Sequence, residues 1–114
     1  MKKIEAILRP EVINQVIIAL NEVGCKGFHF TNVTGQGQQK GIEVFTGRGA
    51  ATTSRSSIPK TLLITVVKDD QKDDIVNAIV DSAGSGKIGD GKIFVSSVDE
   101  VVRVRTGEKN EDAI

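Results

Sequence analysis

The alternation of hydrophobic and polar residues predicts the elements of the first half of the chain. Residues 2–8 alternate and are rich in β-forming residues, which predicts a strand. Pro10 then begins a helix, since a proline in the first turn gives up only an N–H that would be unpaired anyway. Apolar residues recur at helical spacing through 11–23, and Gly24 is a typical residue to end the helix. Residues 28–34 alternate again and predict a second strand.

The second half repeats this plan after a long irregular segment. Residues 35–59 are rich in glycine and small polar residues and have no apolar period, which predicts a long loop of the kind that often carries function. Residues 61–67 form a nearly continuous apolar run, typical of a strand buried on both faces or at a subunit interface. A helix is predicted over 69–83, with acidic residues placed favourably at its start. The last predicted strands are 92–98 and 100–106.

The order of these elements indicates the fold class. Strand, helix and strand occur twice, which is a weak internal repeat and the plan of the ferredoxin-like double βαβ sandwich. This is an α+β fold, with an antiparallel sheet and two helices on one face, here carrying a long loop. The chain of 114 residues is expected to be one domain, 1–114. The free face of the sheet must be solvated or buried, and the apolar residues on both sides of 61–67 favour burial in an oligomer.

Composition and charge narrow the class of partner. The 15 basic and 15 acidic residues give no net charge, which argues against a nucleic-acid partner. No apolar run approaches the roughly 20 residues of a membrane span, and the N-terminal residues do not read as a secretory signal, so we expect no membrane insertion. The single Cys25 cannot form an internal disulfide, which fits a cytoplasmic protein.

Residues 84–92 read GSGKIGDGK and nearly match a phosphate-binding P-loop. However, Ile93 stands where a P-loop has Ser or Thr, and the segment runs from helix to strand, the reverse of the P-loop order. Two interpretations of this segment stay open. Its glycines can expose N–H groups to an anion, with Lys87 and Lys92 supplying charge, or the segment is a flexible turn shaped by its Asp-Gly pair.

Two further segments suit an anion. Arg103 and Arg105 lie two apart on a predicted strand and would share one face, where a phosphate would offset their repulsion. A solvated edge strand protected by charge explains the same pair. The glycines of GQGQQKG at 35–41 let the backbone approach a ligand closely. Together the three segments favour a phosphate ligand.

The sequence offers little for catalysis. It has one His and one Cys, and Asp90 is the one candidate acid or base in the glycine-rich loops. We therefore expect a binding protein and not an enzyme. A ferredoxin-like module for metal or RNA is the weaker alternative, because no metal-ligand spacing occurs and Phe28, Phe30 and Phe94 lack a basic surround.

The chain resembles the PII nitrogen-regulatory signal proteins along its whole length. The resemblance rests on the opening MKKIEAILRPE, GxGxQKG at 35–41, PK at 59–60, GKIGDGKIFV at 86–95 and VVRVRTGEKNEDAI at 101–114. It implies a ferredoxin-like homotrimer that regulates nitrogen metabolism, with ATP or ADP bound in clefts between subunits. It also implies a T-loop at about 37–58, a B-loop at 84–92 and a C-loop at about 104–111.

The resemblance assigns ligand-binding residues by position. The nucleotide-binding residues that it implies are Ile7, His29, Gly35, Gly37, Gln38, Gln39, Val66, Gly89, Asp90, Gly91, Lys92, Arg103 and Arg105. Gln39 is the implied protein ligand of Mg²⁺, which the ATP phosphates and 2-oxoglutarate complete. The implied contacts of 2-oxoglutarate are Gln39, Lys40, Gly41 and Lys60, with the Lys60 ammonium facing a carboxylate of the effector.

The T-loop is the implied contact with a regulated protein. An ammonium transporter is the favoured target and glutamine synthetase the second. Arg48, in the RGA of the family, is expected to enter the mouth of an ammonium channel. The chain has no Tyr, so the sequence excludes uridylylation of a tyrosine.

Three positions depart from the family pattern. Gln38 and Gly84 stand where many members have an arginine on the phosphates, and His29 stands where a Thr is usual near the adenine. Each lost charge-assisted contact costs about 1.5–3 kcal/mol unless water replaces it, so we expect altered nucleotide affinity or an altered preference between ATP and ADP. The alternative function is a nucleotide-only sensor of the same fold, which reads adenylate energy without a response to 2-oxoglutarate.

Overall fold

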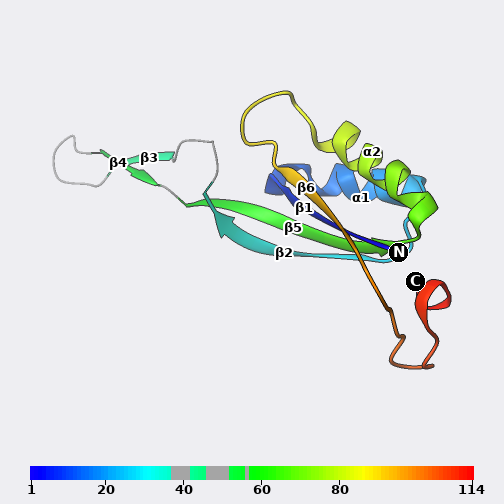
Figure 1. The fold of residues 1–114 in the computed structure, drawn as a ribbon. Coiled ribbons are helices and arrows are strands. Elements are labelled where there is room, and N and C mark those ends of the chain that lie inside the picture. Colours follow the sequence, from blue (N-terminus) through cyan, green and yellow to red (C-terminus); the bar gives the residue numbers. More distant parts are fainter. Residues whose placement is uncertain (37–41, 46–51, 56) are drawn as a thin grey trace.

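The computed structural model describes residues 1–36, 42–45, 52–55 and 57–114 (Figure 1). Its main sheet has four antiparallel strands in the order β2-β5-β1-β6. The strands are β1 Lys2–Leu8, β2 Phe28–Gly35, β5 Ile58–Val67 and β6 Lys92–Ser97. This order confirms the predicted ferredoxin-like α+β fold, because each βαβ unit places its second strand at an edge and its first strand in the centre.

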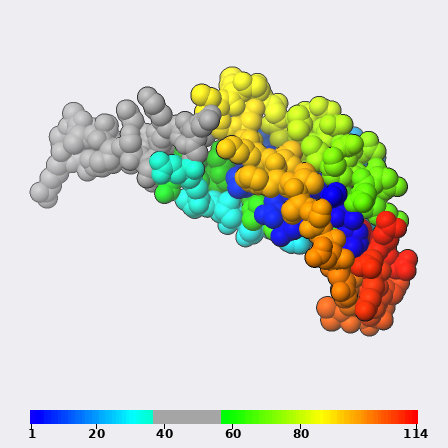
Figure 2. Space-filling view, in the orientation of Figure 1, coloured from blue at the N-terminus to red at the C-terminus, as the bar shows by residue number. Residues whose placement is uncertain are grey.

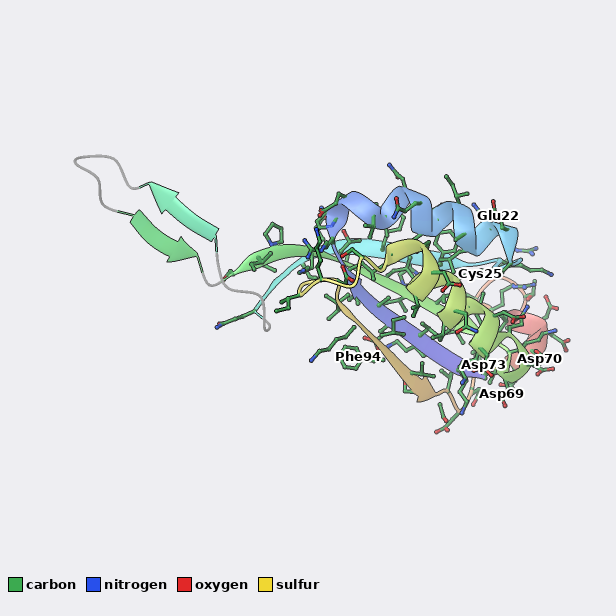
Figure 3. All side chains as sticks on the ribbon, turned by 90° about the horizontal axis from the view of Figure 1, so that it is seen from above. Glu22, Cys25, Asp69, Asp70, Asp73 and Phe94 are labelled. Atoms are coloured by element: carbon green, nitrogen blue, oxygen red, sulfur yellow. The ribbon has the colours of Figure 1, made fainter. Side chains whose placement is uncertain are left out.

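Both helices lie on one face of the sheet (Figure 1). Each begins with a 3₁₀ turn: η1 Pro10–Val12 leads into α1 Ile13–Glu22, and η2 Asp69–Gln71 leads into α2 Lys72–Ala83. Asp69, Asp70 and Asp73 gather where the second helix begins, as the sequence predicted (Figure 3). Negative charge there faces the positive end of the helix dipole and stabilises it. Within the described residues, no helix is long and apolar enough to cross a membrane.

The hydrophobic core fills the space between the helices and the sheet. Alternate residues of each central strand point toward the helices. They pack there against the apolar residues that recur at helical spacing on α1 and α2. Complete burial of one such aliphatic side chain contributes roughly 1.5–3 kcal/mol. The fully buried aliphatic residues with the least exposed surface are Ile4, Ala6, Val16, Leu20, Leu63, Ile75 and Ile79.

The opposite face of the sheet carries an apolar patch on β1 and β5 among charged and polar residues, and the chain leaves this patch partly open. Ile7 of β1 is paired with Leu62, and Ile64 and Val66 follow on the same face of β5; all four are only half-buried. Phe94 of β6 is 52% exposed. The run 61–67 is therefore buried on its helix side alone within one chain. An exposed apolar surface of this kind is the reason why the sequence led us to expect an oligomer.

The predicted strand at 100–106 is wrong. Residues 101–114, which we name the hook, fold back on themselves at the end of β6 (Figure 2). The Arg103 N–H donates to the Glu108 carbonyl (2.9 Å) and the Gly107 N–H to the Arg103 carbonyl (2.8 Å). Gly107 has φ 73°, which suits the turn. The alternating sequence formed no strand because these backbone groups pair inside the hook, so Arg103 and Arg105 do not share a strand face.

Two smaller corrections concern the long loop. Strand β5 begins at Ile58, three residues before the predicted start at 61. Inside the segment predicted as irregular, β3 Ile42–Phe45 pairs with β4 Thr52–Arg55 as an antiparallel ladder. The two strands pair through their backbone N–H and C=O groups. The small polar residues of this segment have no local pattern that predicts such pairing.

Candidate functional site

The glycine-rich loop 84–91 joins α2 to β6 and has a conformation that requires its glycines. Gly86, Gly89 and Gly91 have φ values of 79°, 98° and 105°, a region that other residues adopt only with strain. A Cβ on Gly91 would lie 1.7 Å from the Ile7 carbonyl oxygen, so the loop passes directly against the end of β1. The loop is therefore a built turn and not a flexible link.

Asp90 holds the loop together from inside. Its Oδ2 accepts hydrogen bonds from the Ser85 N–H (2.7 Å) and the Gly86 N–H (2.9 Å), and its Oδ1 accepts from the Ser85 hydroxyl (2.6 Å). These hydrogen bonds, with those from Ser85 the strongest, lower the pKa of Asp90 from 3.8 to about 2. Asp90 is therefore ionised throughout the physiological pH range.

Two basic side chains from other strands bind the loop through its carbonyl groups. Arg9, at the end of β1, donates from Nη2 to the Ile88 carbonyl (2.6 Å), and its Nε lies 3.7 Å from Asp90 Oδ1. Lys60, near the start of β5, donates from Nζ to the Gly89 carbonyl (2.7 Å). Within the described part of the chain, the N–H groups of Ile88 and Gly89 have no hydrogen-bond partner. Carbonyls are thus drawn toward the protein, and amide donors are left for a ligand.

A cavity of about 450 Å³ lies beside the loop. Lys60, Lys87 and Lys92 give it a basic side, and Ile7, Ile58, Ile88 and Phe94 give it an apolar side; Figure 3 shows Phe94 projecting from β6. The remaining lining residues are Gly35, Gln36, Gly89, Asp90 and Gly91. Lysines and unpaired amide groups next to an apolar wall suit a ligand that is anionic at one end and apolar at the other.

A second cavity, of about 320 Å³, lies at the opposite end of the sheet. Residues 24–27, the end of β5 and the hook line it, with Val66 and Arg103 among them. Thr65 fixes this wall, since its hydroxyl donates to the Gly27 carbonyl (2.5 Å). Arg103 is paired with Glu108, Nη1 to Oε1, at 2.8 Å. Its charge is therefore partly neutralised within the hook.

The structure divides the predicted nucleotide-binding residues between these two ends (Figures 1 and 2). Ile7 is paired with Leu62, and Val66 is four residues further along β5, or roughly 13 Å at the rise of a strand. Within a single chain the two groups of residues therefore line separate cavities. The loop end, at the larger cavity, holds Ile7, Gly35, Gly89, Asp90, Gly91 and Lys92; the hook end, at the smaller cavity, holds Val66 and Arg103.

Other predicted residues lie outside both cavities or outside the described residues. His29 is exposed on β2 opposite Ile64, and Arg105 is exposed in the turn of the hook; neither lines the two cavities described above. Gly37, Gln38, Gln39, Lys40, Gly41 and Arg48 lie outside the described residues. The Mg²⁺ role of Gln39 stays a prediction; the described residues contain no group of three His, Cys, Asp or Glu that could hold a metal.

Sequence reasoning missed Arg9 and Ser85, both of which shape the loop. Ser85 stands next to Gly84 in a segment whose glycines, lysines and Asp90 carried the sequence interpretation. Arg9 is 79 residues from Ile88, and only the antiparallel pairing of β1 with β6 brings it to the loop. The available signal for Arg9 was its position between the strand at 2–8 and the helix that begins at Pro10. A basic residue at the end of a strand can contact a neighbouring loop.

The chain has full-length relatives. The family model described as Nitrogen regulatory protein P-II matches residues 1–108. Nitrogen regulatory protein P-II 2 of Methanothermobacter thermautotrophicus is 49% identical, over 100% of this chain and 97% of its own. Nitrogen regulatory protein P-II of Pasteurella multocida is 48% identical over 100% of both chains. The crystal structure of Arabidopsis thaliana PII bound to citrate has a TM-score of 0.79 and 39% identity, over 99% of this chain and 91% of that chain.

Proposed function

This chain belongs to the nitrogen regulatory protein P-II family, whose members are signal transducers and not enzymes, and from this premise we propose that it senses ATP and ADP at sites shared between subunits. The division of the predicted residues carries the proposal. The loop end and the hook end each hold only part of the predicted set, they lie at opposite ends of one sheet, and the apolar patch of β1 and β5 between them is only half-buried. A ring of identical chains can place the loop end of one against the hook end of the next. We propose that the ring is the homotrimer that the resemblance implies.

The loop end supplies the phosphate half of this site. Lys87 and Lys92 provide charge beside the N–H groups of Ile88 and Gly89, while Arg103 of the neighbouring chain approaches from the other side. Arg103 must then exchange Glu108 for phosphate, which its guanidinium can bind through two parallel hydrogen bonds. Val66 and residues 24–27 would line the remainder of the nucleotide. Mg²⁺, when bound, neutralises phosphate charge, and Gln39 is its proposed ligand from the chain.

Lys60 is the proposed contact of 2-oxoglutarate. Its ammonium lies at the loop, 2.7 Å from the Gly89 carbonyl, so a carboxylate bound there would also adjoin the phosphate site. The plant relative is described as bound to citrate, another small carboxylate. We expect Lys60→Ala to abolish the response to 2-oxoglutarate while ATP binding stays within about threefold, a difference under roughly 1 kcal/mol. Calorimetry in Mg²⁺ would measure both, and an unchanged response to 2-oxoglutarate would contradict the assignment.

The output of the sensor is proposed to be the conformation of the T-loop. Mg-ATP with 2-oxoglutarate would favour one arrangement and ADP another, and a target reads the difference. An ammonium transporter contacted by Arg48, or glutamine synthetase, is the proposed target in the cytoplasm. Because the chain has no Tyr, the signal would act without tyrosine uridylylation.

Mixed oligomers test the shared site. Lys92→Ala and Arg103→Ala should each remove ATP binding and leave the oligomer intact, because one variant damages the loop end and the other the hook end. When the two are unfolded together and refolded as a 1:1 mixture, about one quarter of the sites combine two undamaged ends. We expect ATP binding to return at about that fraction. No recovery in mixed oligomers would show that both residues serve one chain, and loss of assembly in both variants would assign them to the interface.

The nucleotide-only sensor remains the second candidate, and Gln38 and Gly84 favour it because both replace an arginine of the family. Titration of 2-oxoglutarate with ATP and Mg²⁺ separates the two candidates. Binding that occurs only with Mg-ATP supports the full sensor. Binding of nucleotide without any binding of 2-oxoglutarate supports the second.

A further inference from the structure

We propose that Asp90, Ser85 and Arg9 form a clamp that holds the glycine loop in its anion-binding conformation before any ligand arrives, so that these residues set nucleotide affinity without touching the nucleotide. The proposal rests on the proposed function, since it takes the loop to be the phosphate end of the site. It assigns Asp90 a positioning role in place of the direct contact that the family pattern implied.

The chemistry of Asp90 argues against a direct phosphate contact. An ionised carboxylate and a phosphate are both hydrogen-bond acceptors with negative charge, so they repel each other. In this structure both Asp90 oxygens are already occupied by the Ser85 and Gly86 donors. The charge of Asp90 is consequently directed into the loop, and the lysines of the cavity keep their positive charge for the ligand.

Ser85 connects the two sides of the loop. Its hydroxyl donates to Asp90 Oδ1 (2.6 Å) and accepts from the Lys87 N–H (3.3 Å). A single hydroxyl therefore positions the lysine backbone relative to the carboxylate. This arrangement turns the carboxylate toward the start of the loop and leaves the N–H groups of Ile88 and Gly89 for the ligand.

Arg9 closes the clamp from β1. It holds the Ile88 carbonyl through Nη2, while its buried Nε has no hydrogen-bond partner among the described residues and lies 3.7 Å from Asp90 Oδ1. A movement of roughly 0.5–1 Å would bring this pair to hydrogen-bond distance. Among the described residues, the clamp therefore has one further bond that it can form, between Arg9 Nε and Asp90 Oδ1.

The direction in which Asp90→Asn changes ATP affinity distinguishes a positioning role of Asp90 from a direct contact with the nucleotide. Asp90→Asn removes negative charge from an anion site, so electrostatics alone would strengthen ATP binding. The amide has a single, uncharged acceptor oxygen, so it can accept from the Ser85 and Gly86 N–H groups or from the Ser85 hydroxyl but not from both. The clamp would therefore be weaker, and ATP binding would weaken with it. We expect Asp90→Asn to bind ATP at least tenfold more weakly, measured by calorimetry in EDTA so that a metal-ligand role makes no contribution. Unchanged or tighter binding would overturn the proposal.

A matched pair at Ser85 provides the second test. Ser85→Ala loses the hydroxyl and Ser85→Thr keeps it, so we expect weaker ATP binding in the first and recovery in the second. Arg9→Ala should weaken ATP binding as well, with partial recovery in Arg9→Lys, which can still reach the Ile88 carbonyl. Equal affinity in the Ala and Thr variants, or in the Ala and Lys variants, would count against the clamp.

Amide hydrogen exchange without nucleotide tests the clamp independently of the proposed function. The Ser85 and Gly86 amides should exchange at least tenfold faster in Asp90→Asn than in the natural chain, while the amides of β1 and β5 stay protected. Unchanged exchange at Ser85 and Gly86 would refute the clamp even if ATP binds. Conversely, if the natural chain fails to bind ATP, the proposed function fails, and the exchange result still decides whether the clamp exists.

Discussion

The loop end and the hook end both lie at the ends of the same strands, yet they are built in different ways. At the loop end, Arg9 after β1 and Lys60 of β5 hold the backbone, and Lys87 and Lys92 line the cavity. At the hook end, the backbone is held mainly by its own hydrogen bonds, and Arg103 is paired with Glu108. In the proposed site, the first end would be prepared for an anion, whereas the second would have to give up the Arg103–Glu108 ion pair to receive one.

In the proposed shared site, this difference would divide nucleotide affinity and nucleotide selectivity between two chains. A preorganised end binds with little loss of conformational freedom, so it sets a baseline affinity. An end that must exchange one partner for another responds to which ligand is present, because the exchange is favourable only when the ligand offers enough charge. We therefore expect changes to the clamp residues Arg9, Ser85 and Asp90 to alter affinity for all nucleotides and changes to Glu108 at the hook end to alter the preference among them.

The largest expected effect comes from Gly91→Ala, with Gly86→Ala as its matched control. Both residues have positive φ, and an alanine there costs about 1–3 kcal/mol. Only Gly91 lies against backbone, 1.7 Å from the Ile7 carbonyl oxygen, while a Cβ on Gly86 meets open space. We expect Gly91→Ala to remove ATP binding and to lower the free energy of unfolding, measured in urea, by at least about 3 kcal/mol. Equal effects of the two variants would mean that the close approach to Ile7 is unimportant.

Acid should open the loop end at a defined pH. The lowered pKa of Asp90 means that its contribution to loop stability is complete above the ordinary pKa of 3.8 and is lost as the pH falls toward about 2. We expect the NMR signals of the Ser85 and Gly86 amides to stay constant from pH 8 to pH 5 and to shift between about pH 4 and 2. Asp90→Asn is the control and should show no such transition. A midpoint at the ordinary pKa would contradict the hydrogen bonds to Asp90.

A smaller effect is expected at the hook end from Glu108→Gln. The Arg103–Glu108 pair is partly exposed, and pairs of this kind contribute about 0–1 kcal/mol to stability. The variant should therefore unfold within about 1 kcal/mol of the natural chain. Because Arg103 no longer has to leave a carboxylate, ATP affinity should rise by up to about fivefold, which corresponds to the same energy. Weaker ATP binding would show that Glu108 orients Arg103 for the nucleotide instead of competing with it.

The smallest effect is expected when the family arginine is restored in Gly84→Arg. A Cβ at this position would lie 2.8 Å from the Val80 carbonyl oxygen, which is backbone and cannot turn away. The end of α2 must shift, and this shift offsets the gain from a new cation near the phosphates. We expect ATP affinity, measured by calorimetry, to change by less than about threefold, or under roughly 1 kcal/mol. A gain of tenfold or more would show that the helix end adapts freely.

Much of the fold was predictable because local patterns specify it. The alternation in residues 2–8 and the helical spacing in 11–23 each contain their own period, and the structure confirms both elements with only small shifts at their ends. The hook was not predictable in this way. Its alternating Val and Arg residues have the pattern of a strand, but a strand requires a partner, and within one chain residues 101–110 bind each other.

The same distinction between local pattern and long-range pairing applies to the candidate site. From the sequence one can read the candidate anion-binding residues, because the glycines of the loop and the lysines beside them are visible as letters. One can also read that residues 61–67 are apolar on both sides of the strand. The contacts of Arg9 and Lys60 with the loop, and the position of Arg103 at the other end of the sheet, follow from the folded chain alone. These placements depend on antiparallel pairing, which joins residues far apart in the chain and leaves no period in the sequence to reveal them.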